Sequence, residues 1–102
     1  MDIKKYHLKV KFKKYKDMIY FSQLDLIHML ERALRRTNLP LYFTQGFNPH
    51  VKISFLNGLK VGKEGVIDAI LYFSEQISIK KFRKELSLQL PEGVEITEIY
   101  DK

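Results

Sequence analysis

Residues 6–13 read Tyr6-His7-Leu8-Lys9-Val10-Lys11-Phe12-Lys13, with a strict two-residue alternation along the whole stretch. In an extended chain, successive side chains point to opposite faces, so the alternation sorts them into two sets. The first set is Tyr6, Leu8, Val10 and Phe12, and the second is His7, Lys9, Lys11 and Lys13. The stretch therefore predicts a half-buried strand with one apolar face and one basic face.

The segment after this strand predicts a helix. Ser22 is followed three residues later by Asp25, a pattern typical of a helix N-terminus. From about Gln23 to Thr37, apolar residues recur at helical spacing, and Pro40 follows. A serine beside a carboxylate also occurs in activated nucleophiles, but the start of a helix explains the pair more simply.

The rest of the chain predicts three strands and a second helix. Alternating or apolar runs occur at 51–55, 66–73 and 94–98, and Ser78 begins a helical pattern that ends near Leu90. Short extended pieces are expected at 18–21 and 41–43. The order β-α-β-β-α-β predicts an α+β fold, the ferredoxin-like sandwich, in which two helices cover one face of a four-stranded antiparallel sheet.

Length and composition fit one domain spanning residues 1–102. Hydrophobic residues make up 45% of the chain and charged residues 29%, as in ordinary globular domains. The chain has no cysteine, which excludes disulfides and cysteine-held clusters, and its three histidines are scattered. We therefore expect no metal and no cofactor. Without a signal peptide or a long apolar run, the sequence predicts a cytoplasmic protein that does not enter membranes.

Charge is unevenly distributed along the chain. Residues 1–63 hold 13 Lys and Arg against four Asp and Glu, whereas residues 64–102 hold five against eight. A strongly basic first part predicts a polyanionic partner, with RNA or DNA first and an acidic protein second.

Two basic surfaces are candidates for contact with phosphates. The first lies on the strand and consists of Lys9, Lys11 and Lys13, beside His7. The second lies on the polar face of the first helix and consists of Arg32, Arg35 and Arg36, beside His28. Each can equally be an ordinary solvated face, and the two are expected on opposite sides of the sandwich. Because Tyr6 and Phe12 share the inward face, base stacking on this strand is not predicted.

The loop Gln45-Gly46-Phe47-Asn48-Pro49-His50 is the most distinctive segment. Polar loop residues between rigid elements often bind ligands. The candidate ligand loop consists of Gln45, Phe47, Asn48, His50 and Lys52. The alternative is that Phe47 fills the core while Asn48-Pro49 forms a turn.

Several segments resemble a known bacterial family. The most specific are Ser22-Gln23-Leu24-Asp25 and Gly46-Phe47-Asn48-Pro49, and further matches lie at 32–40, 53–55, 59–62 and 90–93. They resemble the radical-SAM-linked family, a domain of unknown function fused to or encoded beside radical SAM proteins. Val51 departs from the proline that the family's loop often has there. The family domain is also longer, so the chain resembles its N-terminal half.

The resemblance implies an accessory role. Radical SAM enzymes hold their cluster with three cysteines, and this chain has none. We therefore expect a non-catalytic binding domain that assists a radical SAM partner and contacts RNA or ribonucleoprotein. One alternative is an assembly domain that recognises an acidic protein. A second is a metal-independent ribonuclease that uses His50 with Lys52, or His28.

Overall fold

The first strand lies inside a four-stranded antiparallel sheet. The computed structural model describes residues 6–56 and 65–100. Its strands are β1 (Tyr6–Lys14), β2 (Ile53–Phe55), β3 (Gly65–Phe73) and β4 (Val94–Tyr100). They pair in the order β2-β3-β1-β4, so β1 and β3 are central and β2 and β4 form the edges.

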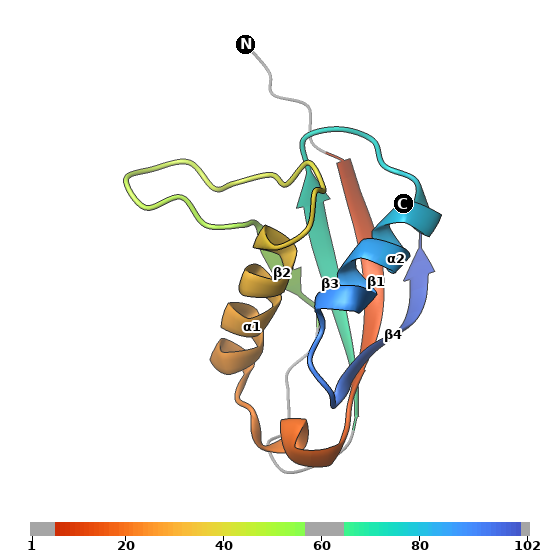
Figure 1. Ribbon diagram of the computed structural model, residues 1–102. Coiled ribbons are helices and arrows are strands. Elements are labelled where there is room, and N and C mark those ends of the chain that lie inside the picture. Colours follow the sequence, from red (N-terminus) through yellow and green to blue (C-terminus); the bar gives the residue numbers. More distant parts are fainter. Residues whose placement is uncertain (1–5, 57–64, 101–102) are drawn as a thin grey trace.

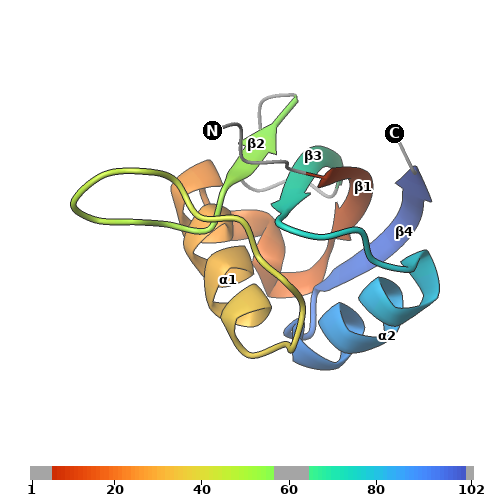
Figure 2. The same cartoon turned by 90° about the horizontal axis from the view of Figure 1, so that it is seen from above.

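Two helices cover one face of this sheet (Figures 1 and 2). They are α1 (Gln23–Arg35) and α2 (Ile79–Gln89), and a short 3-10 helix, η1 (Lys16–Tyr20), precedes α1. The order of strands and helices confirms the predicted ferredoxin-like α+β fold. The opposite face of the sheet is covered by no described helix.

The core lies between the sheet and the two helices. The core includes the inward-facing side chains of β1, which are Leu8, Val10 and Phe12. Within it, the rings of Phe73 and Phe82 pack edge to face, with their centroids 5.7 Å apart. Burial of such apolar side chains is the main stabilising contribution to a fold of this kind. Tyr6 was predicted to share this face, but at the end of the strand it is 37% exposed.

Both helices begin where the sequence predicted. The Ser22 hydroxyl accepts from the Asp25 amide at 3.1 Å, and the Asp25 carboxylate accepts from the Ser22 amide at 3.1 Å. Ser78 caps α2 by accepting from the Lys81 amide at 3.0 Å. The prediction that Ser22 and Asp25 start a helix is confirmed, and their side chains are engaged in doing so. The sequence predicted that α1 continues to about Thr37, but the helix ends at Arg35. Beyond it, the Arg36 and Thr37 amides donate three residues back, to the Ala33 and Leu34 carbonyls, and the Thr37 hydroxyl also donates to the Leu34 carbonyl at 2.6 Å.

Two other segments differ from the prediction. Residues 18–21 were expected to be extended, but most of them belong to η1, which starts at Lys16 with a positive φ of 54°. The strand predicted at 51–55 covers Ile53–Phe55, and Val51 instead forms an isolated bridge with Phe43. The sequence matches at 59–62 lie outside the described residues.

Candidate nucleic-acid interface

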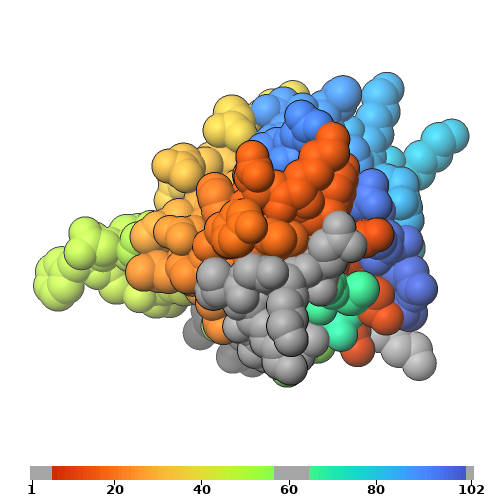
Figure 3. All heavy atoms as spheres, turned by 90° about the horizontal axis from the view of Figure 1, so that it is seen from below, coloured from red at the N-terminus to blue at the C-terminus, as the bar shows by residue number. Residues whose placement is uncertain are grey.

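The loop at residues 44–50 projects beyond the β2 edge of the sandwich (Figures 1 and 3). Its base is closed by two hydrogen bonds, from the Thr44 amide to the His50 carbonyl (2.8 Å) and from the His50 amide to the Thr44 hydroxyl (3.0 Å). Gly46 has a φ of +128°, which favours glycine. The Phe47 side chain is fully exposed. The alternative in which Phe47 fills the core is therefore wrong.

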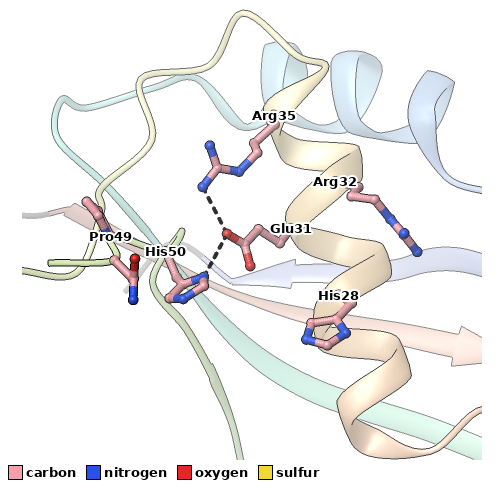
Figure 4. A pocket seen from close by; sticks show the side chains of 7 residues that line it. His28, Glu31, Arg32, Arg35, Pro49 and His50 are labelled. Atoms are coloured by element: carbon pink, nitrogen blue, oxygen red, sulfur yellow. Dashed lines mark hydrogen bonds and ion pairs between the residues drawn. The ribbon is translucent and has the colours of Figure 1, made fainter.

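One carboxylate ties this loop to the first helix (Figure 4). Glu31, on α1, accepts from the Arg35 guanidinium at 3.0 Å, from the Val51 amide at 3.3 Å and lies 3.4 Å from His50 Nδ1. Its side chain is only 13% exposed. Burial favours the neutral acid, but the bonds from Arg35, Val51 and His50 outweigh it and hold the pKa of Glu31 below its ordinary value.

A pocket of about 610 Å³ opens between α1 and the loop. Figure 4 shows side chains from both elements around it. Four lining residues come from α1 and three from the loop: His28, Glu31, Arg32, Arg35, Asn48, Pro49 and His50. The structure thus joins two regions that the sequence suggested separately, the helix face and the ligand loop.

Within this pocket, the positive charge exceeds the negative charge. Arg35 pairs with Glu31, and its guanidinium also lies 5.2 Å from the centre of the Phe43 ring. Arg32 and His28 make no hydrogen bond or ion pair with any residue of the described ranges 6–56 and 65–100. Arg32 is therefore available to an anion, and His28 and His50 line the same pocket.

The third arginine of the predicted helix face lies outside the pocket. Arg36 donates from Nε to the Gln89 side chain at 3.1 Å and from a terminal nitrogen to the Gln89 carbonyl at 3.2 Å. It links the C-terminal ends of α1 and α2. Of the predicted loop residues, Asn48 and His50 line the pocket, whereas Gln45 and Phe47 do not.

Lys9, Lys11 and Lys13 lie on the uncovered face of the sheet, away from the pocket. Lys11 stands in register between Asp68 of β3 and Glu98 of β4, and Lys13 is in register with Glu95. The neighbouring Tyr100 and Glu98 raise the pKa of Lys11. This face therefore carries lysines and carboxylates in near balance, unlike the pocket.

Aromatic residues on the uncovered face come from strands other than the first. Tyr72 of β3 lies 6.2 Å from the ring of His7, and Lys52 Nζ lies 5.3 Å from the Tyr72 ring centre. Tyr100 of β4 lies 5.6 Å from Lys9 Nζ. Lys52, predicted in the ligand loop, thus contacts the sheet instead. Alternation in β1 alone gave no sign of these neighbours.

The sequence reasoning missed Glu31, the residue that assembles the pocket. A smaller pocket of about 380 Å³ at the start of α2 was also missed; it is lined by Ser78, Lys80, Lys81, Lys84 and Glu85. There, Ser78 already serves as the helix cap and Lys81 lies 3.9 Å from Glu85.

Neither a metal site nor a membrane span occurs in the described part of the chain. No group of three or more His, Asp or Glu side chains among residues 6–56 and 65–100 is placed to hold a metal ion. Within the same ranges, no helix has the length and apolar character needed to cross a bilayer.

Comparison with known protein families identifies a matching family. A family model described as "Uncharacterized protein conserved in bacteria (DUF2344)" matches residues 7–101, nearly the whole chain. No curated protein and no solved structure matched.

Proposed function

Because the chain belongs to a bacterial family of uncharacterized proteins (DUF2344), we propose its function from its own surface: it is a non-catalytic accessory domain that binds RNA. The proposed contact is the pocket between α1 and the loop at residues 44–50. The sequence resemblance to radical-SAM-linked proteins supports a partner enzyme of that class. In this proposal the domain holds an RNA or ribonucleoprotein substrate for that enzyme.

The observation that carries the proposal is Arg32, which lines the pocket and makes no ion pair with any of the described residues. Among the described residues, Glu31 is the only carboxylate in the lining, and it is already bound by Arg35, His50 and the Val51 amide. A guanidinium matches the oxygens of a phosphate with two parallel hydrogen bonds, and imidazole N–H groups add further donors. A phosphate is therefore the ligand group that this lining suits best.

Binding of a fluorescently labelled, mixed-sequence RNA tests this proposal. Fluorescence anisotropy at low and physiological salt compares the wild type with Arg32→Ala. Arg36→Ala is the matched control, since it removes the same charge one position outside the pocket lining. We expect about tenfold weaker binding for Arg32→Ala, a typical loss for a charge-assisted hydrogen bond. Its salt dependence is also expected to be shallower.

Two outcomes would contradict the proposal. Equal losses for Arg32→Ala and Arg36→Ala would show that only overall charge matters and that the pocket is not the site. Absence of binding at low salt would remove RNA as the ligand. Co-purification of an acidic protein after nuclease treatment would then support the assembly domain instead.

A second candidate function is favoured by one observation, the presence of both His28 and His50 in the same pocket. In metal-independent RNA cleavage, one imidazole accepts the proton of the 2′-hydroxyl as its oxygen attacks the adjacent phosphorus. The other imidazole gives a proton to the departing 5′-oxygen, which leaves a 2′,3′-cyclic phosphate.

Incubation of end-labelled RNA with the wild type separates the two functions. Intact RNA under conditions of full binding identifies a binding domain. Cleavage that is lost in His50→Ala, with binding retained, identifies a ribonuclease.

A further inference from the structure

We infer that the loop at residues 44–50 makes the site selective for single-stranded RNA, because Phe47 stacks on one unpaired base while the pocket holds a neighbouring phosphate. This inference rests on the proposed function and names its substrate class. It depends on three observations: the exposure of Phe47, the anchoring of the loop, and the position of Phe47 next to the pocket lining.

Phe47 offers both sides of its ring to a ligand. It is fully exposed, and its neighbours Gln45 and Asn48 are exposed polar residues. Gly46 adds no side chain, and a Cβ placed there would meet nothing within 4 Å. The ring therefore has open space around it, as a stacking surface requires.

The loop is anchored at its base, which limits where on the molecule the ring can lie. The bonds between Thr44 and His50 close the loop, and Glu31 binds Val51 and His50 from the helix. The bridge between Phe43 and Val51 extends this closure toward the sheet. Phe47 is thus presented by a short closed loop and not by a long open one.

Phe47 directly precedes the pocket lining in the chain. Asn48, Pro49 and His50 all contribute to the pocket, and consecutive Cα atoms lie about 3.8 Å apart. A nucleotide whose base stacks on Phe47 therefore places its backbone beside Asn48 and His50. Recognition of a base and of an adjacent phosphate then becomes one continuous contact.

The residues around Phe47 favour RNA as its binding partner over a protein that offers an apolar pocket. Protein-docking patches combine several apolar side chains over a contiguous area. Here a single ring stands among polar loop residues, beside a basic pocket. Paired bases in a duplex stack on each other, so only an unpaired base can use the ring.

The test compares one labelled RNA as a single strand and after annealing to its complement. Wild type, Phe47→Leu and Phe47→Trp are titrated with each by anisotropy. We expect the wild type to prefer the single strand. Phe47→Leu, which keeps apolar bulk without an aromatic face, should bind the single strand about tenfold more weakly and the duplex equally well. Phe47→Trp should retain the preference.

The chain has no tryptophan, so Phe47→Trp also introduces a unique fluorophore. Stacking on a base should quench this fluorescence with the single strand and not with the duplex. Because Phe47 is fully exposed, neither substitution should alter folding, which circular dichroism checks.

The outcomes separate this inference from the proposed function. If Arg32→Ala weakens binding while Phe47→Leu binds both RNAs like the wild type, base stacking is wrong and the pocket proposal stands. If the wild type binds neither RNA, both fail. If only a protein partner quenches the fluorophore, Phe47 is a protein anchor and the inference is overturned.

Discussion

Glu31 is the residue on which the candidate site depends most. It is nearly buried and accepts hydrogen bonds from a helix arginine and from the backbone beside the loop. Its spacing along α1 is that of any polar helix position. The approach of the Val51 amide, 20 residues away, is a tertiary contact that no local pattern contains. The sequence therefore suggested the helix face and the loop, but not the carboxylate that joins them.

We predict that Glu31→Gln lowers the free energy of unfolding by about 1 kcal/mol at neutral pH, since it weakens charge-assisted hydrogen bonds. The folded-state pKa of Glu31 is lowered, so the carboxylate stabilises the native state above its unfolded-state pKa. That contribution is lost as the pH falls through the lower folded-state pKa. Urea denaturation between neutral and acidic pH measures both effects.

Glu75→Gln is the control for this prediction, because Glu75 is exposed. It should change neither the stability at neutral pH nor its decline in acid. An unfolding profile for Glu31→Gln that matches the wild type at every pH would refute the role given to Glu31.

Position 93 requires a glycine, both because of its backbone conformation and because of its close neighbours. It has a φ of +100°, and an added Cβ would lie 2.6 Å from Met18 Cγ and 2.8 Å from the Tyr15 carbonyl oxygen. We predict that Gly93→Ala destabilises the domain by about 2 kcal/mol or more. Gly46→Ala is the matched control: its φ is also positive but its surroundings are open, so the loss should be about 1 kcal/mol. Equal losses in urea denaturation would contradict this account.

Among the elements, the two helices differ in how their N-termini are capped. Ser22 and Asp25 exchange two hydrogen bonds at α1, whereas Ser78 makes one at α2. We predict that Ser22→Ala lowers the free energy of unfolding by about 1 kcal/mol, and that Ser78→Ala costs somewhat less. Thermal or urea unfolding of both variants checks the order, and a larger loss for Ser78→Ala would contradict it.

Strands and helices with a clear period were predictable, and segments fixed by distant contacts were not. Alternation located β1, and the apolar run located β3, because burial of one or both faces leaves a local pattern. The 3-10 helix η1 leaves no such pattern. Its position depends on the Tyr15 amide, which donates to the Gly93 carbonyl at 2.8 Å, a contact made across most of the chain.

At the scale of the whole molecule, the two basic surfaces lie apart and differ in charge balance. On the sheet, Lys11 is in register with carboxylates on both neighbouring strands and Lys13 with one on β4. In the described pocket lining, by contrast, the carboxylate of Glu31 is already bound by Arg35, so it does not offset the charge of Arg32. The sequence predicted both surfaces and the topology that separates them. The sequence did not predict the charge balance on the sheet face, because the carboxylates of β4 come from the far end of the chain.

We therefore predict that Lys11→Ala binds RNA within about twofold of the wild type, since the charge it removes is already compensated by Asp68 and Glu98. Arg32→Ala removes the same unit of charge from the other side of the molecule and should bind about tenfold more weakly. Anisotropy titrations at two salt concentrations compare them. A greater loss for Lys11→Ala would place the RNA on the sheet.

The closed base of the loop also limits the conformational entropy that binding can cost. The hydrogen bonds between Thr44 and His50 exist before any ligand arrives, so only residues 45–49 remain to be ordered. Fixing the backbone of one residue costs about 1–2 kcal/mol, which bounds the ordering of this loop at roughly 5–10 kcal/mol. A ligand that docks here therefore does not have to bring the ends of the loop together, and the entropy of loop closure is not part of the cost of binding.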